Sequence, residues 1–137
     1  MNAEIISVGT ELLLGHTINT DAAFVARELS ALGINLLFSC VVGDNAERLK
    51  TAVEQALERS DLVITTGGLG PTDDDLTKET VARAAGLRLT LDEGSMKRLE
   101  AYFAGRTMSR NQIRQAMLPE GCTVFANERG TAPGCGF

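Results

Sequence analysis

Short apolar runs alternate with amphipathic stretches along the first two thirds of the chain. The runs "AEIISV" (Ala3–Val8), "INLLFSCVV" and "DLVITT" (Asp61–Thr66) predict buried strands. Between these runs, apolar residues recur at helical spacing and predict amphipathic helices. Those apolar positions are Ala22, Val25, Leu29 and Leu32 before Gly33, and Leu49, Val53, Ala56 and Leu57 in the next stretch. The stretch "DLTKETVARAAG", closed by Gly86, predicts a third helix.

Strand and helix thus alternate three times, which is the pattern of a parallel sheet covered by helices on both faces. We predict an α/β fold in one domain that spans residues 1–137. Further along, Leu91–Leu118 predicts helix in two pieces separated by Gly105, "PEG" predicts a turn and "CTVFA" a strand. The tail "GTAPGCGF" reaches no further element by this pattern. We therefore expect the sequence to stop before the last strand of its fold.

Composition narrows the classes of partner. The net charge of −5 and the aromatic fraction of 4% argue against nucleic-acid binding, which needs a basic surface or exposed rings. No apolar stretch approaches 18 residues and no signal peptide precedes the first strand, so we expect no membrane association. The three cysteines (Cys40, Cys122 and Cys135) form no C-x-x-C pair, which favours a reducing cytoplasm over a disulfide framework or a zinc site.

Polar loops follow each predicted strand: "GTELLLG", "GDN" and "TTGGLGPTDDD". In open α/β sheets, ligands bind outside the carboxyl ends of the strands, where the strand order reverses. We therefore expect these three loops to converge on one edge of the sheet. No G-x-G-x-x-G follows the first strand and no GK[ST] occurs, so dinucleotide binding of the Rossmann type and P-loop chemistry are both disfavoured.

The third loop contains the most specific pattern. Its glycines allow positive φ and close approach of a ligand to the backbone. Thr72 followed by Asp75 matches a helix-capping pattern, which would place backbone N–H groups where they can bind phosphate. Acids in a first helical turn are also stabilising on structural grounds alone. A cap uses only one acid, however, so three adjacent aspartates favour a functional role for the run.

The other two loops leave their alternatives open. Asp44 is either a functional acid or, like Asn45, an N-cap for the following helix. Glu11 is either an ordinary surface acid or a residue of the ligand crevice. His16 is the only histidine and lacks partners for a catalytic triad, so we interpret it as a partly exposed loop residue.

Four segments together resemble a known family. "AEIISVGTELLLG", "VVGDN", "TTGGLGPTDDDLT" and "NERGTAPG" are similar, in order and spacing, to the N-terminal domain of the CinA (competence/damage-inducible) family. That domain belongs to the wider MogA/MoeA-like, molybdopterin-binding superfamily. The resemblance covers essentially the whole chain. It implies a three-layer αβα sandwich with a mostly parallel sheet, a nucleotide or pterin ligand on the Gly-Gly-x-Gly-Pro loop, and a homo-oligomer, either a dimer or a trimer.

The resemblance also implies roles for individual residues. Asp44 and Asp75 match the two acids of a catalytic pair, and Asp74 is a metal-ligand companion of Asp75. Asp73 falls at a variable position. The ligand-binding residues implied by the resemblance are Thr10, Glu11, Asn19, Gly67, Gly68, Gly70 and Thr72.

The implied activity is hydrolysis of ADP-ribose-type pyrophosphates with a divalent metal ion (Mg²⁺, Mn²⁺ or Co²⁺). In CinA proteins a separate C-terminal domain deamidates nicotinamide mononucleotide. Because this sequence does not contain that domain, we expect no deamidase activity. A second hypothesis is molybdopterin binding or adenylyl transfer in molybdenum cofactor biosynthesis. A third is a non-catalytic oligomerising module in which the acids are only helix caps.

Overall fold

The computed structural model describes residues 1–137 as two compact units, Met1–Gly68 and Leu69–Phe137. The prediction of one domain over the whole chain stays a prediction.

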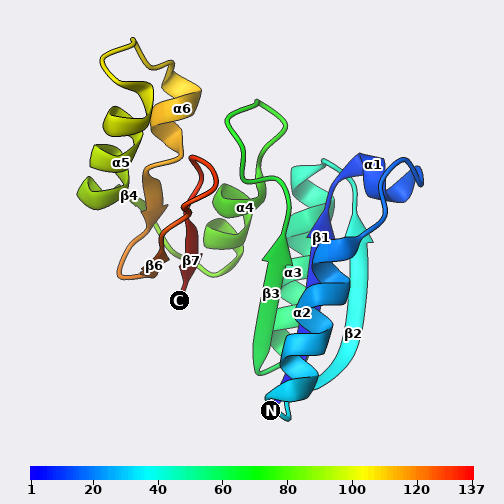
Figure 1. Ribbon diagram of the computed structural model, residues 1–137. Helices are drawn as coiled ribbons and strands as arrows, with labels where there is room; N and C mark the ends of the chain where they lie inside the picture. The colour runs from blue at the N-terminus through cyan, green and yellow to red at the C-terminus, as the bar shows by residue number, and fades with distance from the viewer. The chain divides into compact units, whose positions relative to one another are not determined.

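The first unit is built on a parallel sheet of three strands, β1 (Asn2–Val8), β2 (Asn35–Val42) and β3 (Leu62–Thr66). The strand order is β2-β1-β3, so the first strand of the sequence lies in the centre (Figure 1). All three predicted strands and their parallel pairing are confirmed. The order also means that the chain adds β2 on one side of β1 and then crosses to add β3 on the other.

Helices cover both faces of this sheet. Figure 1 shows α2 (Thr20–Ala31) in front of the strands and α3 (Ala46–Arg59) behind them. Side chains of a strand alternate between the two faces, and Ala3 and Ile5 of β1 pack in one core with Leu29 of α2. Leu49, Val53 and Ala56 of α3 are also buried. Complete burial of one such leucine contributes about 2 kcal/mol of hydrophobic stabilisation.

The loop predicted after the first strand is not entirely irregular. A single helical turn, α1 (Thr10–Leu13), begins directly after Gly9. Leu13 and Leu14 on this turn are more than half exposed, at 57% and 63%. Leu13 and Leu14 therefore do not extend the apolar core, and the continuous run of three leucines has no helical periodicity that would predict this turn.

The second unit combines three helices with two small antiparallel sheets. Its elements are α4 (Thr77–Ala84), β4 (Leu89–Leu91), α5 (Glu93–Phe103), α6 (Arg110–Arg114), β5 (Met117–Pro119), β6 (Thr123–Phe125) and β7 (Gly134–Gly136). Strand β4 pairs with β5, and β6 pairs with β7. No helix in the chain is long and apolar enough to cross a bilayer.

The predicted third helix and the "CTVFA" strand are confirmed as α4 and β6. The predicted helical region divides into α5 and α6 as expected, because Ala104 and Gly105 both adopt positive φ, at 45° and 80°. Its predicted ends are wrong, since Leu91 ends β4 and Met117 begins β5. The expectation that the tail reaches no further element is wrong. Gly134–Gly136 forms β7, where Cys135 pairs with Val124. A three-residue strand with a glycine at each end has no apolar run for a sequence pattern to detect.

Candidate functional site

The strand order of the first unit defines a topological switch point between β1 and β3. The chain leaves β1 in one direction to form β2 and later crosses to β3 on the opposite side. Open α/β sheets bind ligands at this type of position, outside the carboxyl ends of the strands. The segments that leave β1 and β3 here contain Thr10 and Glu11 after one strand, and Gly67 and Gly68 after the other.

Thr10 and Asp44 tie the loops after β1 and β2 together. The backbone N–H of Thr10 donates to Oδ2 of Asp44 over 3.0 Å, and the N–H of Asp44 donates to Oγ1 of Thr10 over 3.1 Å. The N-cap of α3 is Asn45, whose side chain accepts from the N–H of Arg48. Asp44 therefore does not cap α3 and instead joins two strand ends, while its role as a functional acid stays a prediction.

Gly67 lies so close to β1 that no other residue fits. Its φ is +83°, in the left-handed region, and an added Cβ would collide with the carbonyl oxygen of Val8. Gly68 also has positive φ, at 63°. Gly67 and Gly68 thus permit a tight backbone crossing at the switch point, in addition to any approach of a ligand. The expectation of positive φ is wrong for Gly70, where an added Cβ would instead collide with the carboxylate of Asp75.

Glu11 and Asn19 differ in how many of their side-chain polar atoms form hydrogen bonds within the chain. The Glu11 carboxylate folds back over Gly9, where an added Cβ would collide with it. Asn19 uses both ends of its amide, because Oδ1 accepts from the N–H of Ala22 as the N-cap of α2 and Nδ2 donates to Oγ of Ser7 over 2.9 Å. A ligand-binding role for Asn19 stays a prediction, and its observed contacts are structural. His16 is exposed, as expected.

Asp75 in the second unit is held by Thr72. Its Oδ2 accepts from the N–H of Thr72 over 2.9 Å and from the hydroxyl of Thr72 over 2.6 Å. The predicted helix cap at these two residues is wrong in position, because α4 starts only at Thr77 and its N-cap, Leu76, makes no side-chain bond. The pair instead closes a turn in which the N–H of Asp75 donates to the carbonyl of Thr72 over 3.2 Å.

These contacts also determine the acidity of Asp75. Partial burial, the largest single influence, raises the pKa of its carboxyl group. Hydrogen bonds from Thr72 and from the N–H of Gly70, with the nearby charge of Arg114, together outweigh burial. The pKa of Asp75 therefore lies below its usual value, and the group is a carboxylate at neutral pH.

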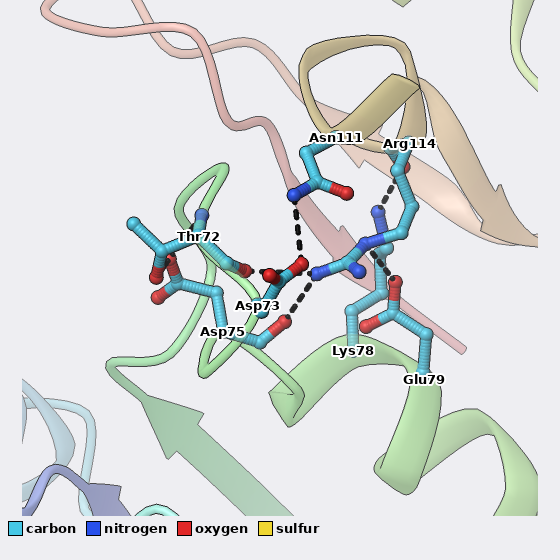
Figure 2. A network of polar contacts seen from close by, with 7 residues as sticks. All are labelled: Thr72, Asp73, Asp75, Lys78, Glu79, Asn111 and Arg114. Atoms are coloured by element: carbon cyan, nitrogen blue, oxygen red, sulfur yellow. Dashed lines mark hydrogen bonds and ion pairs between the residues drawn. The ribbon is translucent and has the colours of Figure 1, made fainter. Parts of the chain in front are cut away.

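The other two aspartates of the run have separate environments. Asp73 accepts a hydrogen bond of 2.8 Å from Nδ2 of Asn111, whereas Asp74 is exposed and makes no hydrogen bond or ion pair. Figure 2 shows that Asn111 and Arg114 both approach the acidic loop from α6. Sequence reasoning missed these two residues, because nothing in a single sequence links them to a loop 38 or more positions earlier.

A metal site made only from the chain's own side chains does not fit this structure. No group of three or more His, Cys, Asp or Glu side chains is close enough to hold an ion. Mg²⁺ commonly binds through one or two carboxylates, with substrate phosphates and water as the remaining ligands. Asp74 and Asp75 fit that limited role, since Asp74 has no other partner and only Oδ2 of Asp75 is engaged by Thr72.

The segment "NERGTAPG" lines a cavity of about 350 Å³ in the second unit. Arg98 and Tyr102 of α5 and Asn127 and Arg129 of the segment are among its lining residues. The segment is folded on itself, because Nδ2 of Asn127 donates to the carbonyl of Ala132 over 3.0 Å. The sequence pattern predicts no site residue in this cavity.

Comparisons with known proteins agree with this architecture. A family model described as a probable molybdopterin binding domain matches residues 4–135. A CinA-like protein of Desulfovibrio desulfuricans is 64% identical over 135 residues, which cover 98% of this chain and 32% of that protein. The crystal structure of CinA from Thermoplasma acidophilum matches with a TM-score of 0.92 and 38% identity, over 98% of this chain and 79% of that one. The Mog protein of molybdopterin biosynthesis from Mycobacterium ulcerans matches with a TM-score of 0.55 and 25% identity, over 77% of this chain and 68% of that one.

The α/β fold and the match over residues 4–135 define the class as that of the molybdopterin binding domains. Within this class, the chain belongs to the CinA-like, competence/damage-inducible family. The resemblance inferred from the four sequence segments and the MogA-like fold are thus confirmed. The chain spans about a third of the length of the curated relatives that it matches.

Proposed function

We propose that this chain is a metal-dependent hydrolase domain for nucleotide pyrophosphates of the ADP-ribose type. The observation that carries the proposal is the switch point between β1 and β3, where the Gly67–Gly68 backbone and the linked pair Thr10 and Asp44 follow the carboxyl ends of parallel strands. Sites of this kind hold phosphorylated ligands on backbone N–H groups, so a net acidic chain can still bind them.

The proposal gives the chain's own residues specific tasks. Gly67, Gly68 and Gly70 would let phosphate oxygens approach the backbone, and Thr10, Glu11 and Asn19 would line the first loop. Asp44 and Asp75 would act as the catalytic acids, with Asp74 and Asp75 as the protein ligands of a Mg²⁺, Mn²⁺ or Co²⁺ ion. Such a cation offsets charge on a pyrophosphate and activates a water molecule when it is bound.

The test is release of AMP from ADP-ribose by the folded protein with each of the three metals. Asp75→Asn should lower kcat/KM by about 10²-fold or more, because it removes a carboxylate from the reacting centre. Asp73→Asn is the matched control, since it makes the same charge change two positions away in a side chain held by Asn111. The control should stay within about threefold of the unmodified protein. The proposal fails if the folded protein releases no AMP with any metal, or if the two variants have equal activity.

Molybdopterin binding or adenylyl transfer is a second candidate, favoured by the family model that matches residues 4–135. The same glycine loop and acids would then bind a pterin phosphate. Parallel titrations with molybdopterin and with ADP-ribose distinguish the two ligands. Tight binding of molybdopterin by a protein that does not bind ADP-ribose would replace the first proposal with the second.

The non-catalytic reading is weakened by the observed geometry. It requires the acids to be helix caps, whereas α4 is capped at Leu76 without a side-chain bond and α3 is capped by Asn45. Assembly into a dimer or a trimer, which the resemblance implies, stays a prediction. Sedimentation velocity at several protein concentrations measures it directly.

A further inference from the structure

A short helix with no predicted site residue holds the acidic loop. Helix α6 is closed at its start by a reciprocal capping box, in which Ser109 Oγ accepts from the N–H of Gln112 and Gln112 Oε1 accepts from the N–H of Ser109. The box fixes the first turn of the helix. Asn111 and Arg114 are three positions apart and therefore lie on the same side of α6, facing the loop (Figure 2).

Arg114 bridges the loop and the following helix. Its Nη2 donates to the carbonyl oxygens of Thr72, over 3.1 Å, and of Asp75, over 2.9 Å. Its Nε forms an ion pair of 3.1 Å with Oε1 of Glu79 on α4. In the reverse direction, Lys78 Nζ donates to the backbone carbonyl of Arg114 over 2.8 Å. A rigid fork of donors suits this task better than a single ammonium group.

The two carbonyls held by Arg114 belong to the same two residues that build the carboxylate contact. Thr72 supplies the N–H and hydroxyl donors, and Asp75 supplies the accepting oxygen. Arg114 therefore fixes both ends of that contact through the main chain, in a segment without helix or strand of its own. Asn111 adds a separate restraint on the loop, because its side-chain amide donates a hydrogen bond to the carboxylate of the neighbouring Asp73.

We propose that Arg114 is a positioning residue for Asp75, supported by Glu79, and that Asn111 positions Asp73 in the same loop. Arg114 touches no reacting atom in this scheme and acts through the backbone of Thr72 and Asp75. Only the kinetic part of the test rests on the hydrolase function proposed above. The geometric part can be measured in a protein with no activity at all.

The central experiment compares Arg114→Gln with Arg110→Gln. Both residues lie on α6 and both substitutions remove one positive charge, but the exposed Arg110 makes no hydrogen bond or ion pair. Amide hydrogen exchange by NMR should show loss of protection at the N–H of Thr72 in Arg114→Gln only, by about tenfold. In the ADP-ribose assay, kcat should fall by about 10²-fold with less than about threefold change in KM, because the acid is misplaced after the ligand has bound.

Further variants separate positioning from charge and from folding. Arg114→Lys keeps the charge, but its single nitrogen cannot occupy both the position of Nη2 beside the two carbonyls and that of Nε beside Glu79, so it should restore neither exchange protection nor kcat. Glu79→Gln should shift both measurements in the same direction by about threefold to tenfold, because it removes the ion-pair partner of Arg114. Asn111→Ala leaves Arg114 in place and should change both measurements by less than about threefold. Glu79→Gln decides the question if Arg114→Gln does not fold.

Two results would overturn the inference. One is equal exchange at Thr72 and equal kcat in Arg114→Gln and Arg110→Gln. The other is full recovery of both measurements in Arg114→Lys, which would leave only a charge effect. If the unmodified protein releases no AMP, the hydrolase proposal fails while the exchange comparison still decides the role of Arg114.

Discussion

The two units fix their candidate site residues in different ways. In the first unit, each strand end is held by a neighbouring strand end of the sheet. The backbone of Gly67 passes close to the carbonyl oxygen of Val8, and Thr10 forms a hydrogen bond with Asp44. In the second unit, the acidic loop is held by α6 side chains 38 to 42 positions further along the chain. Direct contacts between adjacent strand ends therefore hold the candidate residues of the first unit, whereas side chains of a separate helix hold those of the second.

This difference predicts two patterns of mutational effect. Where the backbone is held by close packing, substitutions should mainly change the free energy of unfolding. Where a loop is held by side chains that it does not itself contain, substitutions in the distant helix should change the loop more than the overall stability. The following variants test this contrast, starting with the largest expected change in stability.

Gly67→Ala should cause the largest loss of stability. An alanine here combines positive φ with a collision between Cβ and the carbonyl of Val8, so the backbone of β1 or β3 must shift. We expect a loss of about 3 kcal/mol or more in the free energy of unfolding, measured by urea denaturation.

Gly33→Ala is the control for this prediction. Its φ of +71° is similar, but an added Cβ meets nothing within 4 Å. It should cost about 1 kcal/mol, which isolates the cost of positive φ from that of the collision. Equal losses in the two variants would show that the close crossing of β1 contributes nothing to stability.

Glu4→Gln should cause the next largest loss. Glu4 is 1% exposed and accepts two hydrogen bonds from Arg59, of 3.0 Å and 2.7 Å. In the Gln variant, the side-chain NH₂ group would face an N–H donor of Arg59 at this buried position. We expect a loss of about 2 kcal/mol in the free energy of unfolding. Exchange at the N–H of Thr72 should not change, in contrast to Glu79→Gln in the second unit.

Glu54→Gln makes the same substitution on the surface. Glu54 pairs with Lys50 along α3 over 3.2 Å, and the side chains are 46% and 34% exposed. Exposed pairs of this kind contribute little, so the loss should be within about 0.5 kcal/mol. If Glu54→Gln were as costly as Glu4→Gln, burial would not explain the importance of Glu4.

The same contrast explains how far the sequence predicts the structure. The three parallel strands and the helices between them follow from apolar periodicity, because each element buries a contiguous face such as Leu49, Val53 and Ala56. The short strands β4, β5 and β7 have three residues each and show no such period. Family resemblance selected Asp44 and Asp75 as candidate acids, whereas Arg114 and Asn111 depend on a tertiary contact that no local pattern encodes.

Asp92→Ala should have an intermediate effect that depends on pH. Asp92 is the N-cap of α5, and its Oδ2 accepts from the N–H of Ser95 over 2.6 Å. Loss of such a cap costs about 1 kcal/mol at neutral pH. Asp75→Ala should cost less, because Asp75 does not cap α4.

The pH dependence of this cap has a definite sign. Hydrogen bonds with Ser95, through its side chain and its backbone, hold the pKa of Asp92 below its usual value. The folded state therefore releases this proton more readily than the unfolded chain, whose carboxyl has a pKa of about 3.9. The contribution is present above that pH and is lost as the pH falls through the lower folded pKa. Urea denaturation of Asp92→Ala should thus differ from the unmodified protein at pH 7, and the difference should shrink as the pH falls below the unfolded pKa of about 3.9.

Asp74→Asn should have the smallest effect on stability and is the most direct test of the acidic run. Asp74 is exposed and has no hydrogen bond or ion pair, so the free energy of unfolding should change by less than about 0.5 kcal/mol. Removal of one of three adjacent like charges relieves repulsion, so a slight gain in stability is the expected direction. If Asp74 is a cation ligand, the Mn²⁺ concentration needed for half-maximal AMP release should rise by about tenfold, since one charged ligand is worth roughly 1.4 kcal/mol or more of binding. A variant with unchanged stability and unchanged metal dependence would leave Asp74 a solvated charge and Asp75 the only acid of the run with a function.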